Sequence, residues 1–328
     1  DDAIAATHGR IAMQSLEDAG YHVYVETMTA LEEHKTLKTV HSFFDEMMSN
    51  RLERSSPVVA LGGGITGDTA GFAAATWLRG VPLIQVPTTL LAMVDASIGG
   101  KTGVNLTRTG SESGLAKNLI GAFWQPRLIL ADPRTLTTLE DRHFRCGLAE
   151  CIKHAIIAGE EHLRFMQDSL DAILARDDAA LLALISTSAS IKIHIVEQDE
   201  RESGVRALLN LGHTFAHAIE AGPDNPWLHG EAVAIGLLAA ARCSSILGKC
   251  EVDCVDEIQS LLGNAGLPTA LEPGRDVEQL MQAMTFDKKV KDGRVRLILP
   301  LRIGACAIVE DVPQSTLREV WDSVGARV

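Results

Sequence analysis

Three histidines in two short strings are the residues whose types and spacing best fit the chemistry of a divalent metal. His213 and His217 lie in Asn-Leu-Gly-His-Thr-Phe-Ala-His, and His229 lies in Leu-His-Gly-Glu. Residues four apart on a helix project from one face about one turn apart, so His213 and His217 could share one ion. On an alanine-rich helix, such a pair is equally typical of packed or surface positions. The third histidine, followed by Glu231, favours the metal site.

A helical stretch upstream adds a carboxylate to these histidines. It reads Gly-Leu-Ala-Glu-Cys-Ile-Lys-His and contains Glu150 and Lys153. Three neutral or anionic ligands with one open coordination position are typical of catalytic zinc sites, whereas structural sites use four protein ligands. Cys146 and Cys151 flank Glu150, but we do not expect them to bind metal. The sequence therefore predicts a metal-dependent enzyme.

Length and charge limit the remaining possibilities. The chain has 328 residues, more than one hydrophobic core usually covers, so we expect two domains. We assign them to residues 1–139 and 140–328. The formal net charge of −13 argues against binding to nucleic acid or to an anionic membrane. In so acidic a chain, basic residues near the motifs indicate an anionic ligand.

Neither the apolar residues nor the cysteines indicate a membrane or an oxidising compartment. The longest apolar run, residues 232–241, is too short to span a bilayer and predicts a buried helix. The six cysteines form no Cys-x-x-Cys pair, which is typical of free thiols in a reducing compartment, so we expect a cytoplasmic protein. The chain opens on a predicted helix, and we expect a first strand before it in a longer precursor. Import into a plastid is therefore the alternative location.

The first part of the chain alternates short apolar strands with amphipathic helices, which is typical of an α/β fold. The expected elements are helix 3–19, strand 21–25, helix 35–50 and strands 57–61, 83–86 and 128–131. From about residue 135 onward, alanine and leucine recur at helical spacing, apart from a late strand at 296–300. We therefore predict a Rossmann-like α/β domain followed by a mainly α-helical domain that binds the metal.

A glycine-rich turn follows the strand predicted at 57–61. Gly62, Gly64 and Gly67 satisfy the pattern G-x-G-x-x-G between a strand and a helix. Such a turn lets the backbone approach a pyrophosphate, and the helix offers free N–H groups. The acidic residue that would bind the ribose is missing, because the next strand ends Val-Pro-Thr-Thr at residues 86–89. The alternative is a turn that only packs the helix against the strand.

A second glycine-rich segment, residues 99–103, surrounds Lys101. Gly99 and Gly100 precede the lysine and Gly103 follows it, which is typical of a backbone folded against an anion. The spacing of a nucleotide-triphosphate loop fails, however, because residue 95 is Asp. Other basic residues also lie in segments rich in glycine and alanine, and we expect a pocket for a phosphorylated, carboxylated substrate. The basic residues of this set are Lys101, Lys117, Lys153, Lys192, Arg206 and Lys288.

Eight strings, taken together and in order, resemble those of the 3-dehydroquinate synthase family within the sugar phosphate cyclases. The resemblance covers essentially the whole chain, and the string Lys-Asn-Leu-Ile-Gly-Ala-Phe-Trp-Gln-Pro favours the dehydroquinate branch over its cyclitol-forming relatives. The strings occupy residues 60–68, 85–90, 94–103, 117–126, 147–150, 208–213, 228–231 and 287–289.

The resemblance implies a lyase that uses NAD and zinc, with Co²⁺ as a possible substitute, to convert 3-deoxy-D-arabino-heptulosonate 7-phosphate into 3-dehydroquinate and phosphate. The implied steps are transient oxidation, β-elimination, reduction and intramolecular aldol closure, in the shikimate route to chorismate and the aromatic amino acids. Two alternatives remain open. A cyclase of the 2-epi-5-epi-valiolone synthase type would share the metal and NAD residues, and a metal-dependent polyol dehydrogenase would release NADH.

The resemblance also changes the expected metal ligands. It implies Glu150, His213 and His229, and it leaves His217 as a nearby active-site residue. The positions implied for NAD are Gly63, Gly64, Asp68, Thr88 and Thr89, with Glu32 and Lys35 for the ribose and phosphate. The implied substrate-binding positions are Asp95, Lys101, Lys117, Asn118, Lys153, Lys192, Arg206, Asn210, His217 and Lys288. Arg79 matches a residue donated by a neighbouring subunit, which implies a homodimer.

The segment 106–116 departs from the family pattern. It is several residues longer than the usual link, and its glycine and serine content predicts a surface loop. Ala116 replaces the usual glycine before Lys117. We expect the insertion to extend outward and to spare the pocket.

Overall fold

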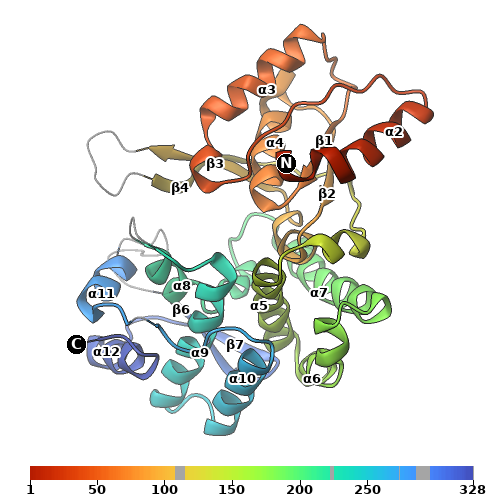
Figure 1. The fold of residues 1–328 in the computed structure, drawn as a ribbon. Helices are drawn as coiled ribbons and strands as arrows, with labels where there is room; N and C mark the ends of the chain where they lie inside the picture. The colour runs from red at the N-terminus through yellow and green to blue at the C-terminus, as the bar shows by residue number, and fades with distance from the viewer. Residues whose placement is uncertain (108–114, 222–224, 273, 286–295, 328) are drawn as a thin grey trace. The chain divides into compact units, whose positions relative to one another are not determined.

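The computed structural model describes residues 1–107, 115–221, 225–272, 274–285 and 296–327. Within these ranges the chain forms two compact units, Asp1–Leu139 and Glu140–Val328, which are labelled unit 1 and unit 2 below. Figure 1 shows unit 1 as an α/β unit and unit 2 as a mainly helical one. This is the fold class that the sequence predicts.

Unit 1 begins with helices and an irregular segment. The helix expected at 3–19 is present as α1 (Asp2–Ile4), a π-helical stretch (Ala5–Gly9) and α2 (Arg10–Asp18). The strand expected at 21–25 is wrong. Tyr21 and Tyr24 are more than half exposed, and this segment pairs with no strand in the described part of unit 1. Alternating aromatic and β-branched residues produce the period of a strand, but a strand also needs a partner edge.

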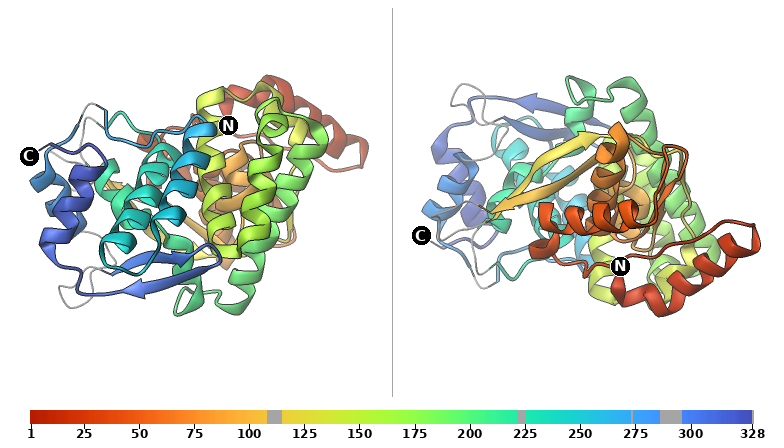
Figure 2. Two further views of the ribbon diagram at one scale, coloured as in Figure 1. Left: turned by 90° about the horizontal axis from the view of Figure 1, so that it is seen from below. Right: turned by 90° about the horizontal axis from the view of Figure 1, so that it is seen from above.

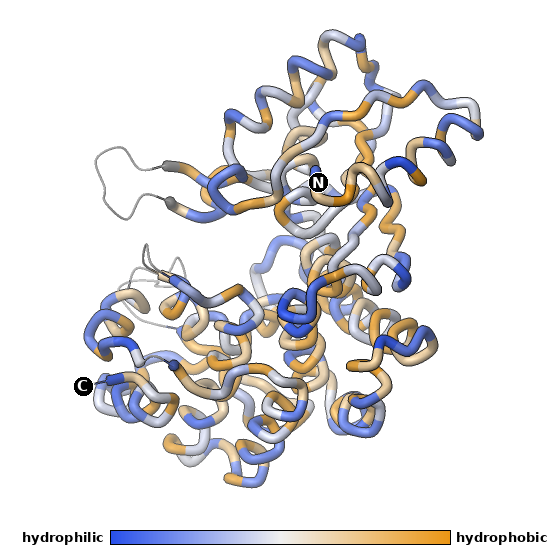
Figure 3. Tube along the Cα trace, viewed as in Figure 1, coloured by the Kyte–Doolittle hydropathy of each residue, from blue (hydrophilic) through white to orange (hydrophobic). Residues whose placement is uncertain are grey.

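The centre of unit 1 is a parallel sheet with the order β1-β2-β5, formed by Val58–Gly62, Leu83–Pro87 and Leu128–Ile129. Helix α4 (Gly64–Thr76) follows β1 directly, so the predicted strand, glycine turn and helix are confirmed. Helix α3 (Leu37–Ser49) buries Val40, Phe43 and Met47, which recur at helical spacing. The alternation of polar and apolar residues along α3 can be followed in Figure 3.

A β-hairpin in unit 1 was not expected from the sequence. Strand β3 (Lys101–Thr107) pairs antiparallel with β4 (Leu115–Phe123), in a register that places Val104 opposite Ile120. The ends of the segment expected to be a loop, 106–107 and 115–116, are therefore strand. The expected outward course of the insertion lies at 108–114, outside the described residues.

Unit 2 consists mainly of helices. Helices α5 (Asp141–Ala158), α6 (Glu160–Leu174) and α7 (Asp178–Gln198) lie side by side (Figure 2). The remaining elements are α8 (His213–Glu220), α9 (His229–Ile246), α10 (Val252–Asn264), α11 (Val277–Thr285), β6 (Leu297–Arg302), β7 (Ala305–Val309) and α12 (Gln314–Ser323). The late strand is thus confirmed as β6, and its antiparallel partner β7 was missed.

Helix α9 forms the centre of unit 2. It packs against α5, α8, α10, α12 and β6, and its segment 232–241 is completely buried. A helix that is apolar on all sides is buried on all sides, which is the structure that this run predicted.

Helix α7 was overlooked as a long apolar segment. It has 21 residues, and the mean hydropathy of its most apolar window is 1.7, so by length and composition it could cross a membrane. In the structure 39% of that window is buried, and α7 packs on α5 and α6 with Leu184, Ser188 and Lys192 inside. Length and composition of one such helix are therefore weak evidence for a membrane span.

Two glycine contacts bring α9 close to its neighbours. Gly212, just before α8, has a left-handed backbone with φ 76°, and a Cβ there would lie 2.7 Å from the nitrogen of Leu237. A Cβ on Gly230, at the start of α9, would overlap the backbone of Cys146 in α5. These close approaches require glycine, because any side chain would push the helices apart.

We predict that Gly212→Ala lowers the free energy of unfolding by about 2–4 kcal/mol, because it adds steric overlap to a left-handed backbone. The matched control is Gly248→Ala. Gly248 has φ 65°, but nothing lies within 4 Å of its Cβ position, so about 1 kcal/mol of backbone cost should remain. Urea unfolding followed by circular dichroism measures both. Equal losses in the two variants would show that the helix contact contributes nothing.

Candidate metal centre and cofactor-binding residues

The candidate metal centre is built on Glu150, in the middle of α5. Its side chain is 1% exposed, and a carboxylate removed from water to this degree needs charged or hydrogen-bonding partners. Lys153, three residues further along α5 and equally buried, forms an ion pair with Oε2 of Glu150. One helix thus supplies both a buried anion and the cation that stabilises it.

Two imidazoles from other helices face the same carboxylate. His213 begins α8 and His229 begins α9, and their Nε2 atoms lie 3.6 and 3.4 Å from Oε1 of Glu150. The possible ligand atoms of the three residues all lie within 4.8 Å of one another. One carboxylate and two imidazoles from three helices therefore converge as a ligand set suited to zinc.

His217, which helical spacing paired with His213, lies outside this ligand set. Its ring centre is 5.7 Å from that of His213, in an edge-on arrangement, and the residue is exposed. The pairing of His213 with His217 that helical spacing suggested is replaced by the pairing of His213 with His229. Helical periodicity records neighbours on one helix, whereas His229 approaches from another helix.

Second partners fix the orientation of both imidazoles. Nδ1 of His213 lies 3.1 Å from the carbonyl oxygen of Leu211, and Nδ1 of His229 lies 3.4 Å from the carboxylate of Glu220. When Nδ1–H donates to these oxygens, Nε2 of each ring is directed at Glu150. The sequence reasoning missed Glu220. Its only signal was its place as the last residue of the helix that His213 begins.

The charges around His229 shift its titration. Burial lowers the pKa of His229, but the carboxylates of Glu150 and Glu220 outweigh this effect and raise the pKa to about 10. A proton on this imidazole therefore occupies the place that a metal ion would take. Metal binding and protonation compete at this residue.

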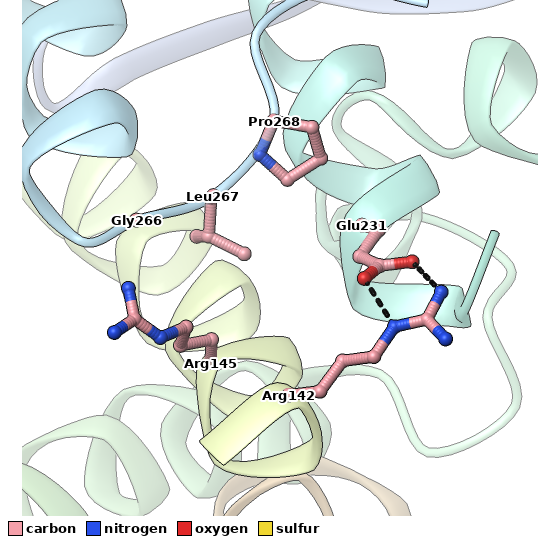
Figure 4. Close-up of a pocket in the computed structure, with 6 residues that line it drawn as sticks. All are labelled: Arg142, Arg145, Glu231, Gly266, Leu267 and Pro268. Carbon is pink, nitrogen blue, oxygen red and sulfur yellow. Dashed lines mark hydrogen bonds and ion pairs between the residues drawn. The ribbon is translucent and has the colours of Figure 1, made fainter. Parts of the chain in front are cut away.

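Glu231, which follows His229 closely in the sequence, shapes the start of α9. Its carboxylate accepts a 2.8 Å hydrogen bond from the backbone N–H of Leu228 and forms two bonds of 2.7 and 2.8 Å with Arg142. Figure 4 shows this pair at the edge of a pocket that contains none of the three candidate ligands. Burial raises the pKa of Glu231, but the guanidinium of Arg142 outweighs it and the pKa is lowered. Glu231 therefore holds the helix end, and it is not a ligand in this arrangement.

The turn after α7 holds two further predicted residues. Arg206, 2% exposed, and Asn210 both lie in the 3₁₀ helix Val205–Asn210, which packs against α5 and α7. Asp199 accepts bonds from the backbone N–H groups of Ser203, Gly204 and Arg206 at 2.8, 2.6 and 3.1 Å. These bonds lower the pKa of Asp199 to about 2. Asp199, which the sequence reasoning missed, thus shapes the turn that carries Arg206.

The other predicted substrate-binding residues are placed separately. Lys192 is buried in α7 at 7% exposure, and Lys288 lies outside the described residues. In unit 1, Asp95 lies in a π-helical turn (Ala92–Ala96), and Lys101 begins β3. Arg79 is exposed, and its φ of 69° is rare for a residue with a side chain. Within unit 2, Lys153 contacts the candidate ligand Glu150, and the ring of His217 lies beside that of His213.

The glycine turn in unit 1 brings together the residues predicted for the NAD phosphates. Gly63 precedes α4, no side chain caps that helix, and a Cβ on Gly63 would lie 3.2 Å from Cγ2 of Thr89. The N–H of Thr88 donates to the carbonyl oxygen of Gly62 at 2.9 Å. Gly63, Gly64, Thr88 and Thr89 therefore surround a helix start with free N–H groups, a geometry that suits a phosphate.

A second cluster in unit 1 is centred on Lys35. This lysine is 3% exposed, and its Nζ lies 2.6 Å from both Oδ2 of Asp68 and Oδ1 of Asn118. Asn105 connects the hairpin to this cluster. Its side chain donates to the carbonyl oxygen of Glu32 at 3.1 Å and accepts from the N–H of Asn118 at 2.8 Å.

This cluster joins residues to which the sequence assigned different roles. Lys117 lies 3.9 Å from Oε2 of Glu32, so Lys117 and Asn118, predicted for the substrate, adjoin Glu32, Lys35 and Asp68, predicted for the cofactor. Asn105 is the residue that was missed. Its only signal was its place at the end of the glycine-rich string, before a segment that was expected to be a loop.

Comparison with protein families gives two matches that together cover most of the chain. Residues 25–146 match a family model described as 3-dehydroquinate synthase N-terminal, and residues 147–290 match one described as 3-dehydroquinate synthase C-terminal. Among curated proteins, the 3-dehydroquinate synthase of Nostoc sp. is 46% identical over 315 residues, which are 95% of this chain and 85% of that protein. That of Nitrosomonas europaea is 48% identical over 304 residues, 92% of this chain and 80% of that protein.

Solved structures of similar fold include cyclases that form cyclitols. A 2-epi-5-epi-valiolone synthase from Streptomyces hygroscopicus, solved with NAD⁺ and Zn²⁺, is 28% identical with a TM-score of 0.90, and the match covers 99% of this chain and 89% of that one. A 2-deoxy-scyllo-inosose synthase complexed with carbaglucose-6-phosphate, NAD⁺ and Co²⁺ is also 28% identical, with a TM-score of 0.86 over 96% and 88% of the two chains. A probable glycerol dehydrogenase from Sinorhizobium meliloti, at 15% identity and a TM-score of 0.62, shares the fold alone.

We predict that the imidazole of His229 in chelator-treated protein titrates near pH 10 and not near its ordinary value of 6.5. Because the pKa is higher in the folded state, the stability gained from this charge is complete below about pH 6.5 and is lost as pH rises through about 10. NMR of ¹³C-labelled histidine measures the titration, with His229→Gln to assign the signal. A midpoint near 6.5 would contradict the arrangement of the two carboxylates.

We predict that Lys35→Met destabilises unit 1 by about 1–3 kcal/mol, because Asp68 and Asn118 lose a buried cationic partner. Lys38→Met is the matched control, since Lys38 is exposed on the adjacent helix α3 and should change stability by less than about 0.5 kcal/mol. Thermal unfolding of both variants tests this. If Lys35→Met behaves like the control, the cluster does not depend on its lysine.

Proposed function

The chain belongs to the 3-dehydroquinate synthase family, and we propose that it converts 3-deoxy-D-arabino-heptulosonate 7-phosphate into 3-dehydroquinate and phosphate. The convergence of Glu150, His213 and His229 is the single observation that carries this proposal, because it provides the metal centre that the chemistry needs. The 46% identity to a curated 3-dehydroquinate synthase over 95% of the chain supports the same activity.

We propose zinc as the metal, with cobalt as a possible substitute. One carboxylate and two imidazoles leave a coordination position open, which suits a catalytic zinc ion and not a structural one. A zinc ion bound there would supply a Lewis acid that lowers the pKa of a substrate hydroxyl. The Zn²⁺ and Co²⁺ in the similar structures support both metals.

We propose NAD as the cofactor of unit 1. The strand, glycine turn and uncapped helix start suit its pyrophosphate, and the cluster of Glu32, Lys35 and Asp68 is the candidate for the ribose and phosphate. NAD bound there would supply a hydride acceptor, and because the proposed reaction involves no net oxidation, no net NADH is expected. The NAD⁺ in both similar cyclase structures supports this assignment.

The residues of this chain would bind and orient the substrate. We assign the carboxylate and phosphate groups to Lys192, Arg206 and Lys288 of unit 2 and to Lys101 and Asn118 of unit 1. Lys192 and Arg206 are buried cations, which bind such groups in fixed geometry, and orientation alone can lower a barrier substantially. We assign to Lys153 the role of holding the candidate ligand Glu150 in place, and to His217, whose exposed ring lies beside that of His213, the transfer of a proton.

We further propose that the protein acts as a cytoplasmic homodimer in which Arg79 reaches the phosphate site of the neighbouring subunit. Arg79 suits this role because it is exposed and held in a rare backbone conformation between Leu78, with φ 48°, and Gly80. The acidic composition, with a formal net charge of −13, supports a small-molecule substrate over nucleic acid or a membrane.

We predict that the purified protein releases phosphate from the heptulosonate phosphate, that a chelator abolishes this release, and that Zn²⁺ restores it. His213→Ala should lower the rate about 1000-fold or more, because a Lewis acid contributes several kcal/mol. His162→Ala, on α6 and outside the ligand set, is the matched control and should retain the activity. Phosphate release and product identity by mass spectrometry are the measurements.

The same assay separates the alternatives. Cyclisation of sedoheptulose 7-phosphate in preference to the heptulosonate would indicate a cyclitol-forming enzyme, whereas steady growth of NADH absorbance would indicate a polyol dehydrogenase. Phosphate release that is unchanged by the chelator would contradict the metal centre.

A further inference from the structure

Helix α8 carries a candidate ligand at one end and an acidic residue at the other. His213 is its first residue and Glu220 its last, and both side chains are directed toward His229 of the next helix. Glu220 is only 10% exposed in its side chain, and its Oε1 and Oε2 each lie 3.4 Å from Nδ1 of His229. The two ends of one short helix thus contact the same imidazole.

A carboxylate at this place opposes the helix to which it belongs. The carbonyl end of a helix carries a partial negative charge, so a largely buried glutamate there is destabilised unless a nearby cation offsets it. Arg275 caps this end, because its guanidinium donates to the carbonyl oxygen of Ile219 and, at 2.7 Å, to that of Ala221. Arg275 therefore satisfies the carbonyl groups on either side of Glu220, while the carboxylate itself faces His229.

We propose that Glu220 is a positioning residue for the metal centre: its carboxylate holds the ring of His229 so that Nε2 faces the ion. Donation of Nδ1–H to the carboxylate selects one tautomer, fixes the ring plane and makes Nε2 a better electron donor. His213 receives the same orientation from the carbonyl oxygen of Leu211, but without the added negative charge. The two imidazoles therefore differ in donor strength, and His229 is the stronger ligand. This inference rests on the proposed metal site.

The test measures zinc affinity and not activity. Glu220→Ala and Glu220→Gln are loaded with zinc in competition with a chromophoric chelator, and the absorption of the Co²⁺-loaded proteins reports ligand geometry. We expect Glu220→Ala to lower zinc affinity about 10- to 100-fold and to change the Co²⁺ spectrum. Glu220→Gln should recover most of the affinity, because its amide oxygen still accepts from Nδ1–H.

Glu278→Ala is the matched control. Glu278 forms an exposed pair with Arg318 on the surface of unit 2, so its loss should leave zinc affinity and the Co²⁺ spectrum unchanged. If Glu220→Ala fails to fold, the test compares Glu220→Gln with Glu220→Asp. The shorter carboxylate of Glu220→Asp cannot keep the contact with His229, so this variant should bind zinc more weakly than Glu220→Gln. Unchanged zinc affinity in folded Glu220→Ala or Glu220→Asp would overturn the inference. Failure of the unmutated protein to bind zinc would instead overturn the proposed metal centre, and this inference with it.

Discussion

The buried carboxylate of Glu150 is the constraint on which unit 2 depends. Removing one ionised carboxylate from water costs several kcal/mol, so nearby charged or hydrogen-bonding groups must stabilise it. Lys153 pairs with one oxygen from the same helix, and His213 and His229 approach the other oxygen from α8 and α9. Because the charges of Glu150 and Lys153 cancel, a divalent ion bound here would keep its full positive charge toward an anionic substrate.

The same principle recurs in unit 1 with other residues. The chain has a formal net charge of −13, yet Lys35, Lys153 and Arg206 are each at most 3% exposed. Lysine and arginine are rarely buried to this degree unless they are paired. Lys35 pairs with Asp68 in unit 1, as Lys153 pairs with Glu150 in unit 2. In both units the buried lysine holds an acidic residue in a fixed position, which a flexible surface pair would not do.

The sequence predicted the features that depend on local pattern. The predictions failed where contacts with residues far away in the chain determine the structure. The strand and glycine turn before α4, and the buried run in α9, follow from periodicity and from the properties of glycine. The segment 21–25 has the alternation of a strand without a partner edge. The two ends of the 106–116 segment pair with each other as strands, which the composition of the segment did not reveal. Glu220 and Asn105 were missed for the same reason. Their roles arise from contacts made by residues far away in the chain or on another helix, and a single sequence does not record such contacts.

His213 and His229 are each the first residue of a helix. This position affects the competition between a proton and a metal ion at the centre. Ligation requires a neutral imidazole, but Glu150 and Glu220 together favour the protonated form of His229. The positive ends of α8 and α9 oppose this effect, since they stabilise the carboxylate of Glu150 and disfavour a positive charge on the rings. Gly212 and Gly230 adjoin the two histidines and set the helix ends against α9 and α5, so the backbone fixes the place of each histidine, and Leu211 and Glu220 then orient the two rings. A centre positioned in this way keeps its geometry whether a proton or a metal ion occupies it, because the helix contacts, and not the occupant, determine where the ligands lie.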